Sequence, residues 1–185
     1  MPVEETILWE RTEEPGHESA RLRGNGGEFF LEGSAVFDHE GAPCRLEYLV
    51  VTDERFHTRR GSVEGWVGER NLSIEVAARD GRWTLSGTEC AEVEGAVDLD
   101  LNFSPSTNLL PIRRLRLEVG QEAPVRSAWL RFPDFDLKPL EQIYRRVSES
   151  RYFYRSDSGF EAELEVSPAG FVSIYPGIAR IQGKR

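Results

Sequence analysis

Along most of the chain, apolar and polar residues alternate with a period of two, as expected for β-strands that bury one face. The pattern recurs in short segments that are rich in β-branched and aromatic residues and bounded by turn-forming residues. These segments span residues 5–12, 28–38, 44–60, 72–87, 96–103, 112–119, 125–132, 151–156, 160–177 and 178–182. Such a succession predicts a mostly β protein, with a single large antiparallel curved sheet or an open β-barrel.

One segment departs from this alternation. Residues 134–150 place apolar side chains at helical spacing. The side chains concerned are Leu137, Leu140, Ile143, Tyr144 and Val147. Pro139 fits the first turn of a helix, where its missing N–H costs nothing. The segment therefore predicts one short helix, which we expect to cap an end of the sheet.

The stretch from Asp98 to Gly120 alternates on both sides of a turn-like Ser-Pro-Ser-Thr sequence. Folding the two arms together as a hairpin places Asp100 opposite Arg114 and Asp98 opposite Arg116, with leucines on the other face. This register predicts a cross-strand ladder of charges.

Arg113 does not fit the ladder, because it shares the apolar face of the predicted hairpin. An arginine there needs a buried carboxylate or a polar cavity. The even-numbered face is a second candidate for the interior wall. The pattern leaves open which face of the hairpin points inward.

Composition narrows the function classes. A chain of 185 residues favours a single domain over residues 1–185. The net charge of −9 and a pI near 5.0 argue against a nucleic-acid partner or an anionic membrane held by bulk charge. The acidic N-terminus does not read as a signal peptide, and we expect no transmembrane segment and a cytoplasmic protein. Cys44 and Cys90 fit two buried thiols in a reducing compartment.

No cofactor or metal is expected. The chain has no phosphate-cradling glycine loop, dinucleotide motif or nucleophile elbow. His17, His39 and His57 are isolated from one another and share no metal-ligand spacing. Aromatic residues, by contrast, occur in nearly every predicted strand. Most belong in the core, but aromatic walls with a few arginines and aspartates would suit a sugar or an amphipathic headgroup.

Five stretches, in this order, resemble a known family. They are Trp9–Ser19 (with "EEPGHES"), Val97–Leu117 ("VDLDLNFSPSTNLLPIRRLRL"), Ala128–Phe135 ("AWLRFPDF"), Tyr144–Ser156 ("YRRVSESRYFYRS") and Val172–Gly177 ("VSIYPG"). Together they are similar to the bacterial family named "putative glycolipid-binding". The resemblance covers nearly the whole chain, and the Val97–Leu117 stretch is its most specific part.

The resemblance implies an antiparallel β fold that curves around a cavity, like that of bacterial carriers of lipids or lipoproteins. Two positions depart from the family pattern. Ala96 stands where a cysteine is usual, and Leu109 stands where a threonine is usual. A thiol-based activity is therefore less expected in this chain.

The first hypothesis is non-catalytic binding of an amphipathic ligand, such as a glycolipid, in a β-barrel-like cavity. Arg113 and Arg114 would contact the headgroup, and Asn108 and Asp100 would orient it. Apolar walls would come from Trp9, Trp129 and Tyr175. The hypothesis requires an elongated cavity with an apolar lining and polar groups at its mouth, and a solid core would argue against it.

Two alternatives remain open. The first is a hydrolase in which Asp98 and Asp100, about 7 Å apart on one strand face, act as an acid–base pair, with His17 as a remote third candidate. Arginine partners would keep both aspartates ionised, which suits a structural ladder better. The second is an interaction protein that forms a homodimer through a sheet edge or an aromatic patch.

Overall fold

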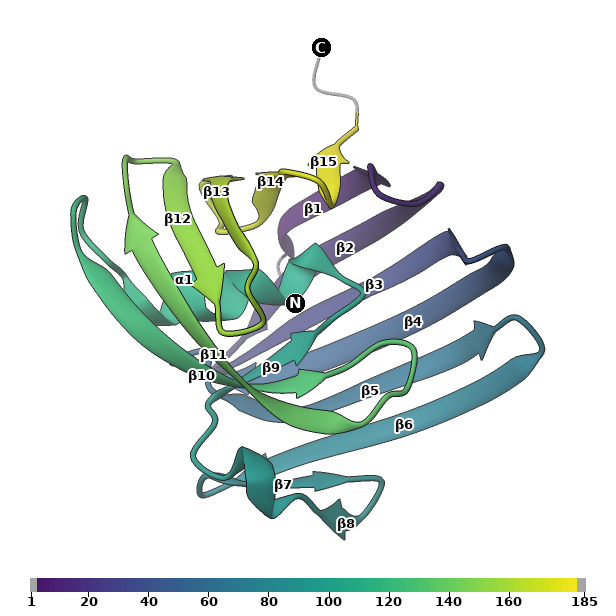
Figure 1. Ribbon diagram of the computed structural model, residues 1–185. Helices are drawn as coiled ribbons and strands as arrows, with labels where there is room; N and C mark the ends of the chain where they lie inside the picture. Colours follow the sequence, from purple (N-terminus) through teal and green to yellow (C-terminus); the bar gives the residue numbers. More distant parts are fainter. Residues whose placement is uncertain (1–2, 183–185) are drawn as a thin grey trace.

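The computed structural model describes residues 3–182, with side chains from residue 5 onward. Its strands form one continuous curved sheet (Figure 1). Every neighbouring pair of strands is antiparallel except β9 and β10, which run parallel. The prediction of a mostly β protein with a large curved sheet and one short helix is confirmed, and the sheet does not close into a barrel.

The first half of the chain builds one side of the sheet as a meander. Its strands are β1 (Val3–Arg11), β2 (Gly16–Asn25), β3 (Glu28–His39), β4 (Ala42–Asp53), β5 (Thr58–Val67), β6 (Arg70–Arg79), β7 (Arg82–Leu85) and β8 (Thr88–Glu89). Residues 40–41 form the turn between β3 and β4, and residues 80–81 form the turn between β6 and β7. Of these strands, β2 was not among the predicted segments.

The second half returns to the first strand. It contains the 3-10 helix η1 (Ala91–Val93), β9 (Asp98–Leu101), the 3-10 helix η2 (Pro105–Asn108), α1 (Leu109–Leu115), β10 (Glu122–Leu130), β11 (Leu137–Arg146), β12 (Arg151–Ser156), β13 (Glu161–Val166), β14 (Val172–Tyr175) and β15 (Ala179–Ile181). The last strand, β15, pairs with β1, so both halves belong to one sheet.

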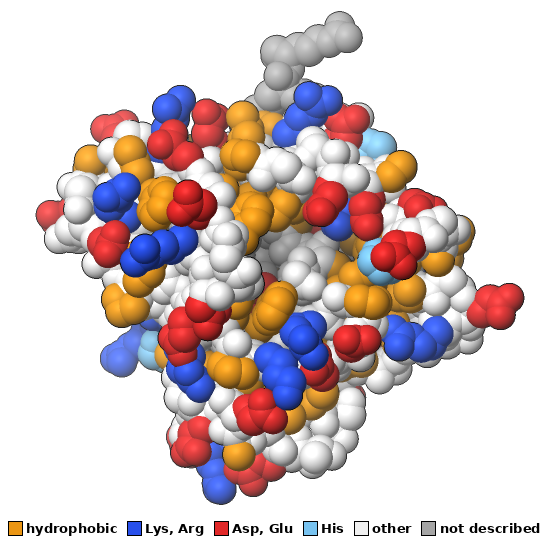
Figure 2. All heavy atoms as spheres, viewed as in Figure 1, with side chains coloured by type: hydrophobic (Ala, Val, Ile, Leu, Met, Phe, Trp, Pro, Cys, Tyr) orange, Lys and Arg blue, Asp and Glu red, His pale blue; other side chains and the backbone are white. Residues whose placement is uncertain are grey.

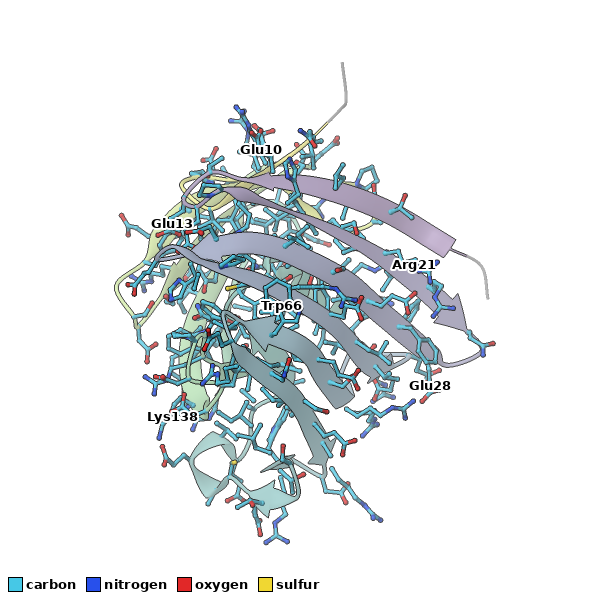
Figure 3. All side chains as sticks on the ribbon, turned by 90° about the vertical axis from the view of Figure 1, so that its right-hand side faces the viewer. Glu10, Glu13, Arg21, Glu28, Trp66 and Lys138 are labelled. Atoms are coloured by element: carbon cyan, nitrogen blue, oxygen red, sulfur yellow. The ribbon has the colours of Figure 1, made fainter. Side chains whose placement is uncertain are left out.

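Alternation decides which side chains fill the concave side. In β4, Cys44, Leu46, Tyr48 and Val50 are buried, while their neighbours up to Glu47 are exposed. The outward side of β1–β6 carries charged side chains such as Arg21 (Figure 3). Glycine at position 33 leaves space for the side chain of Tyr48 on the inner side. A Cβ at this position would lie 2.4 Å from the Tyr48 hydroxyl oxygen.

Two hydrophobic cores fill the curved sheet, and α1 lies between them. The larger core joins β1–β7 to β9, β10 and the start of α1, through residues such as Trp9, Leu99 and Leu109. The smaller core joins α1 to β10–β14, through residues such as Ile112 and Tyr144. Side chains of the larger core thus fill the concave side of β1–β7.

The helix predicted at residues 134–150 is wrong, because this segment forms β11. Its buried positions include Leu140, Gln142 and Tyr144, which alternate as in any strand. The buried amide of Gln142 interrupts the apolar alternation, so the remaining apolar residues mimic helical spacing. Pro139 lies where β10 is the only neighbouring strand, a position that tolerates proline.

The hairpin predicted at residues 98–120 is also wrong. β9 pairs with β10, and the second arm forms α1. The turn-like Ser-Pro-Ser-Thr sequence starts η2, where the Ser104 hydroxyl accepts a hydrogen bond from the Ser106 N–H and Pro105 stands in the first turn. Instead of the expected Asp100–Arg114 and Asp98–Arg116 pairs, Arg114 binds Asp98.

The two edge strands of the sheet offer little backbone for pairing with another chain. β8 has only two residues. On β9, the backbone N–H groups of Leu99 and Leu101 donate to the hydroxyls of Thr58 and Thr107. An edge-to-edge homodimer therefore has no long, open strand to use among the described residues.

Candidate functional site

A pocket of about 240 Å³ opens on the side of β9–β14 that faces η2. Its polar lining includes Asp100, Asn102, Ser104, Asn108 and Ser156. Its aromatic lining consists of Trp129, Tyr154, Phe160 and Tyr175. We call it the Asp100 pocket. The molecular face in Figure 2 is hollowed near its centre, with hydrophobic and charged side chains around the hollow.

Asp100 lies on β9 and places its carboxylate in this pocket. Burial raises the pKa of Asp100 to about 6; the hydrogen bond from Gln142 opposes the shift, and the nearby charge of Asp98 adds to it. At neutral pH the carboxylate is therefore mostly ionised and can accept hydrogen bonds from hydroxyl groups of a ligand.

Gln142, on β11 of the same sheet, holds Asp100. Its Nε2 donates to Asp100 Oδ2 at 2.8 Å and to the Tyr154 hydroxyl at 3.1 Å. Its Oε1 accepts a hydrogen bond from the Ser127 hydroxyl at 3.0 Å. Because Gln142 and Ser127 are buried, this network fixes the carboxylate before any ligand arrives.

Asn108 is fixed in the same way at the junction of η2 and α1. Its Oδ1 accepts a hydrogen bond from the Tyr144 hydroxyl at 2.7 Å, and its Nδ2 donates to the Pro105 carbonyl at 3.2 Å. Only 8% of Asn108 is exposed. The amide thus forms a rigid polar corner of the pocket.

The aromatic wall is a connected cluster. Tyr154 packs edge-to-face against Tyr144 and Tyr175, with ring centroids 5.1 and 6.2 Å apart. Phe160 packs against Tyr175 at 5.7 Å. Burial raises the pKa of Tyr154 and of Tyr175 far above neutrality, so both hydroxyls stay protonated. The wall combines ring surfaces with hydroxyl groups.

Behind the pocket lies a buried carboxyl group, Glu18. Its Oε1 accepts hydrogen bonds from the hydroxyls of Tyr48, at 2.6 Å, and Ser104. Its Oε2 has no hydrogen-bond partner within the described part of the chain. Burial raises the pKa of Glu18 to about 7, although both hydroxyls and the charge of Arg11 lower it. Ser104 links this group to the pocket.

Arg113 and Arg114 lie elsewhere, in a second cleft of about 630 Å³. It is lined by Glu54, Arg55, Phe56, His57, Arg113, Arg114 and Arg116, and we call it the arginine cleft. Arg114 forms a two-pronged pair with Asp98, which is only 1% exposed. This pair joins the C-terminal end of α1 to β9.

Trp9 does not reach either cavity. It is fully buried, its Nε1 donates to the Val172 carbonyl at 2.7 Å, and its ring packs against Phe171. Of the seven ligand-binding residues predicted, the Asp100 pocket brings together Asp100, Asn108, Trp129 and Tyr175. The structure separates them from Arg113 and Arg114 in the arginine cleft and from Trp9 in the larger core.

A family model described as "Putative glycolipid-binding" matches residues 6–181. The chain belongs to this family.

A solved structure shares the fold. It is a DUF1089 family protein from Pseudomonas aeruginosa, with 29% sequence identity and a TM-score of 0.76. The match covers 88% of this chain and 91% of that chain. No curated protein matches the chain. Within residues 3–182, none of the helices has the length and apolar character needed to cross a membrane.

Four of the five stretches that carry the family resemblance line the Asp100 pocket, and the first reaches it through the hydrogen bond between Glu18 and Ser104. In chain order they supply Glu18, then Asp100 with Ser104 and Asn108, then Trp129, then Tyr154, and finally Tyr175. Residues far apart in the sequence thus converge on one small volume. The arginine cleft, by contrast, draws on only the second of these stretches, together with the β4–β5 turn.

Sequence reasoning missed several residues of the site. Gln142, Tyr154 and Glu18 were not among the candidates, although each is buried with polar partners. A signal did exist for Gln142: a polar residue stands where strand alternation requires an apolar one. No pattern pointed to Glu18, because its partners lie 30 and 86 residues away in the sequence.

The residues considered for hydrolysis are not arranged as a catalytic set. Asp98 is buried behind Arg114 and does not line the pocket, whereas Asp100 does. Burial raises the pKa of Asp98, and the hydrogen bonds and charge of Arg114 lower it. His17 and Ser19 lie on the outward side of β2, opposite to Glu18.

Proposed function

We propose that the protein binds, without catalysing a reaction, the hydroxyl-rich headgroup of an amphipathic ligand such as a glycolipid. The Asp100 pocket is the binding site in this proposal. The observation that carries it is the convergence of the family-like stretches on a small cavity that combines aromatic faces with fixed hydrogen-bonding groups. Such a combination suits the faces and hydroxyls of a sugar.

The size of the pocket supports a headgroup rather than a whole lipid. Its 240 Å³ is below the roughly 300–1,000 Å³ of pockets that enclose drug-sized ligands. Among the described residues, side chains of the larger core fill the space between β1–β7 and β9–β10 where an acyl chain would otherwise lie. The apolar part of the ligand would therefore extend out of the pocket past lining residues such as Phe160 and Ile178, which are half-buried.

Each polar group has a role that follows from its partners. Asp100, held by Gln142, accepts hydrogen bonds from ligand hydroxyls. Asn108 and the pocket serines provide further polar contacts at fixed positions. Trp129 is half-buried and offers a ring surface at the pocket wall.

Calorimetric titration with methyl β-glucoside, methyl β-galactoside and octyl β-glucoside tests this proposal. We expect saturable binding of at least one glycoside, and a Kd raised about tenfold in Trp129→Ala. Trp66→Ala is the matched control, because Trp66 is also half-buried but lies on the outward side of the sheet (Figure 3). An equal loss in both variants, or no saturable binding, would contradict the proposal.

One observation favours a second candidate, hydrolysis of a glycosidic bond with Asp100 as general acid. A carboxyl group with a pKa of about 6 inside a cavity suits that role. Among the described residues that line the pocket, Asp100 is the one carboxylate, and Asp98 is held by Arg114 outside the pocket. Turnover of nitrophenyl glycosides by the wild type, abolished in Asp100→Asn, would favour this candidate over simple binding.

A further inference from the structure

The arginine cleft concentrates positive charge on a protein that is negative overall. Among the described residues that line it are four arginines, His57 and one carboxylate, Glu54, and His57 Nδ1 lies 3.7 Å from Asp53 Oδ2. Asp98, at the base of the cleft, offsets the charge of Arg114. Because the whole chain carries a net charge of −9, long-range electrostatics repel anions, and the cleft is a local exception.

A rigid turn presents two of the basic side chains. Asp53 clamps the β4–β5 turn: its Oδ1 accepts the backbone N–H groups of Arg55 and His57, both at 2.9 Å, and its Oδ2 accepts from Arg59 at 2.7 Å. Phe56, between them, has a φ of 63°, which is rare for a bulky residue. The ring of Phe56 is buried and stacks on Phe29, so the turn is anchored in the larger core.

The other basic side chains come from the end of α1. The guanidinium of Arg113 lies 4.9 Å from the ring centre of Phe56, and its Nη1 donates to the Ala169 carbonyl at 3.2 Å. Gly170 allows this approach, because a Cβ there would lie 3.2 Å from Arg113 Cγ. Arg116 ends the helix in the left-handed conformation, with a φ of 48°.

Helix stabilisation alone does not account for the cleft. The partial negative charge at the C-terminus of α1 favours Arg113, Arg114 and Arg116 where they are. It does not explain why a separate element brings Arg55 and His57 to the same cavity. Arg55 and Arg116 are exposed, and neither forms an ion pair with any residue that the structure describes.

We propose that the arginine cleft binds a phosphate group, either as free phosphate or as the phosphomonoester headgroup of a lipid. Guanidinium forks from two elements can reach different oxygens of one dianion, as phosphate recognition requires. Phe56 contributes the apolar part of the cleft lining. The proposal does not depend on sugar binding in the Asp100 pocket.

Calorimetric titration with inorganic phosphate tests the site directly. We expect saturable binding to the wild type and a Kd raised about tenfold in the double variant Arg55→Gln/Arg116→Gln. Both side chains are exposed, so the variant should fold, which thermal unfolding followed by circular dichroism verifies.

The matched control is Arg145→Gln/Arg155→Gln. These arginines are exposed on β11 and β12, away from the cleft, and their loss changes the net charge by the same amount. An unchanged Kd in the control supports a local site. A Kd that rises equally in both double variants would show bulk electrostatics and overturn the proposal.

Vesicle sedimentation separates the two sources of phosphate. Binding to phosphatidylcholine vesicles that contain phosphatidic acid, but not to pure phosphatidylcholine, identifies a lipid headgroup. Binding of inorganic phosphate without vesicle binding identifies the free ion. Binding of neither probe overturns the proposal.

Discussion

The Asp100 pocket and the arginine cleft lie at opposite ends of the η2–α1 segment. The pKa values of their carboxyl groups are shifted in opposite directions. In and behind the pocket, burial raises the pKa of Asp100 to about 6 and that of Glu18 to about 7. At the cleft, burial also acts to raise the pKa of Asp53, but hydrogen bonds from His57 and Arg55 outweigh it and the pKa is lowered. The pocket penalises negative charge, and the cleft turn stabilises it.

Because of this difference, we expect the two regions to select ligands by different properties. Buried partners fix the polar groups of the pocket, so its hydrogen bonds depend on ligand shape. The cleft presents exposed guanidinium groups, whose attraction for anions depends on salt. The buried Asp98–Arg114 pair joins α1 to the sheet between the two regions.

The largest expected effect comes from breaking that pair. Arg114→Met should lower the free energy of unfolding by about 3 kcal/mol, because it leaves the buried Asp98 without its counter-charge. Urea denaturation measures the change. The control is Arg116→Met, two residues on but exposed, which we expect to stay within about 0.5 kcal/mol of the wild type. Equal effects of the two substitutions would mean that the pair does not anchor α1.

The buried carboxyl group of Glu18 should make the free energy of unfolding depend on pH. The folded state raises its pKa from 4.5 to about 7, so folded protein binds the proton more tightly than unfolded protein. Its contribution to stability is therefore full below pH 4.5 and is lost as pH rises to 7, by about 3 kcal/mol. Glu18→Gln should remove this loss.

Unfolding in urea at pH 4.5 and pH 8 provides the measurement for Glu18. Relative to the wild type, the variant should gain about 3 kcal/mol between the two pH values. If the difference between variant and wild type is the same at both pH values, the carboxyl group does not titrate as its burial implies.

Asp53 should show a smaller effect of the opposite sign. Its lowered pKa gives stability that is present above the unfolded-state pKa and is lost as pH falls through the folded-state pKa. Asp53→Asn should cost about 1 kcal/mol at pH 7, because charge-assisted hydrogen bonds to the β4–β5 turn weaken. Thermal unfolding at pH 7 and pH 3 should show the difference shrinking on acidification, and growth on acidification would argue against this account.

Much of the sheet could be predicted from sequence, because alternation over long meander strands reports directly on which face is buried. The predictions of secondary structure were wrong or incomplete for strands in which a polar side chain is buried and hydrogen-bonded. Gln142 interrupts the apolar alternation of β11, because its buried amide donates hydrogen bonds to Asp100 and Tyr154. The missed strand β2 likewise carries Glu18 at a buried position.

The candidate site was only partly predictable for the same reason. Asp100, Asn108, Trp129 and Tyr175 were named from residue type and family resemblance, and they line one pocket. Their grouping with Arg113 and Arg114 relied on a hairpin that does not form. Leu109 and Ile112 fit a helix as well as a strand, and only packing between two cores selects the helix.

The most direct test of sugar binding is a titration of 15N-labelled protein with octyl β-glucoside below its micelle concentration, followed through the tryptophan indole N–H signals. The chain has four tryptophans. Trp9 and Trp83 donate to buried carbonyls, Trp66 lies on the outward side, and Trp129 lines the pocket. A saturable shift of the Trp129 signal, with the Trp66 signal unchanged, is the expected result. A Trp129 signal that does not move, or that moves only together with Trp66, would contradict binding in the Asp100 pocket.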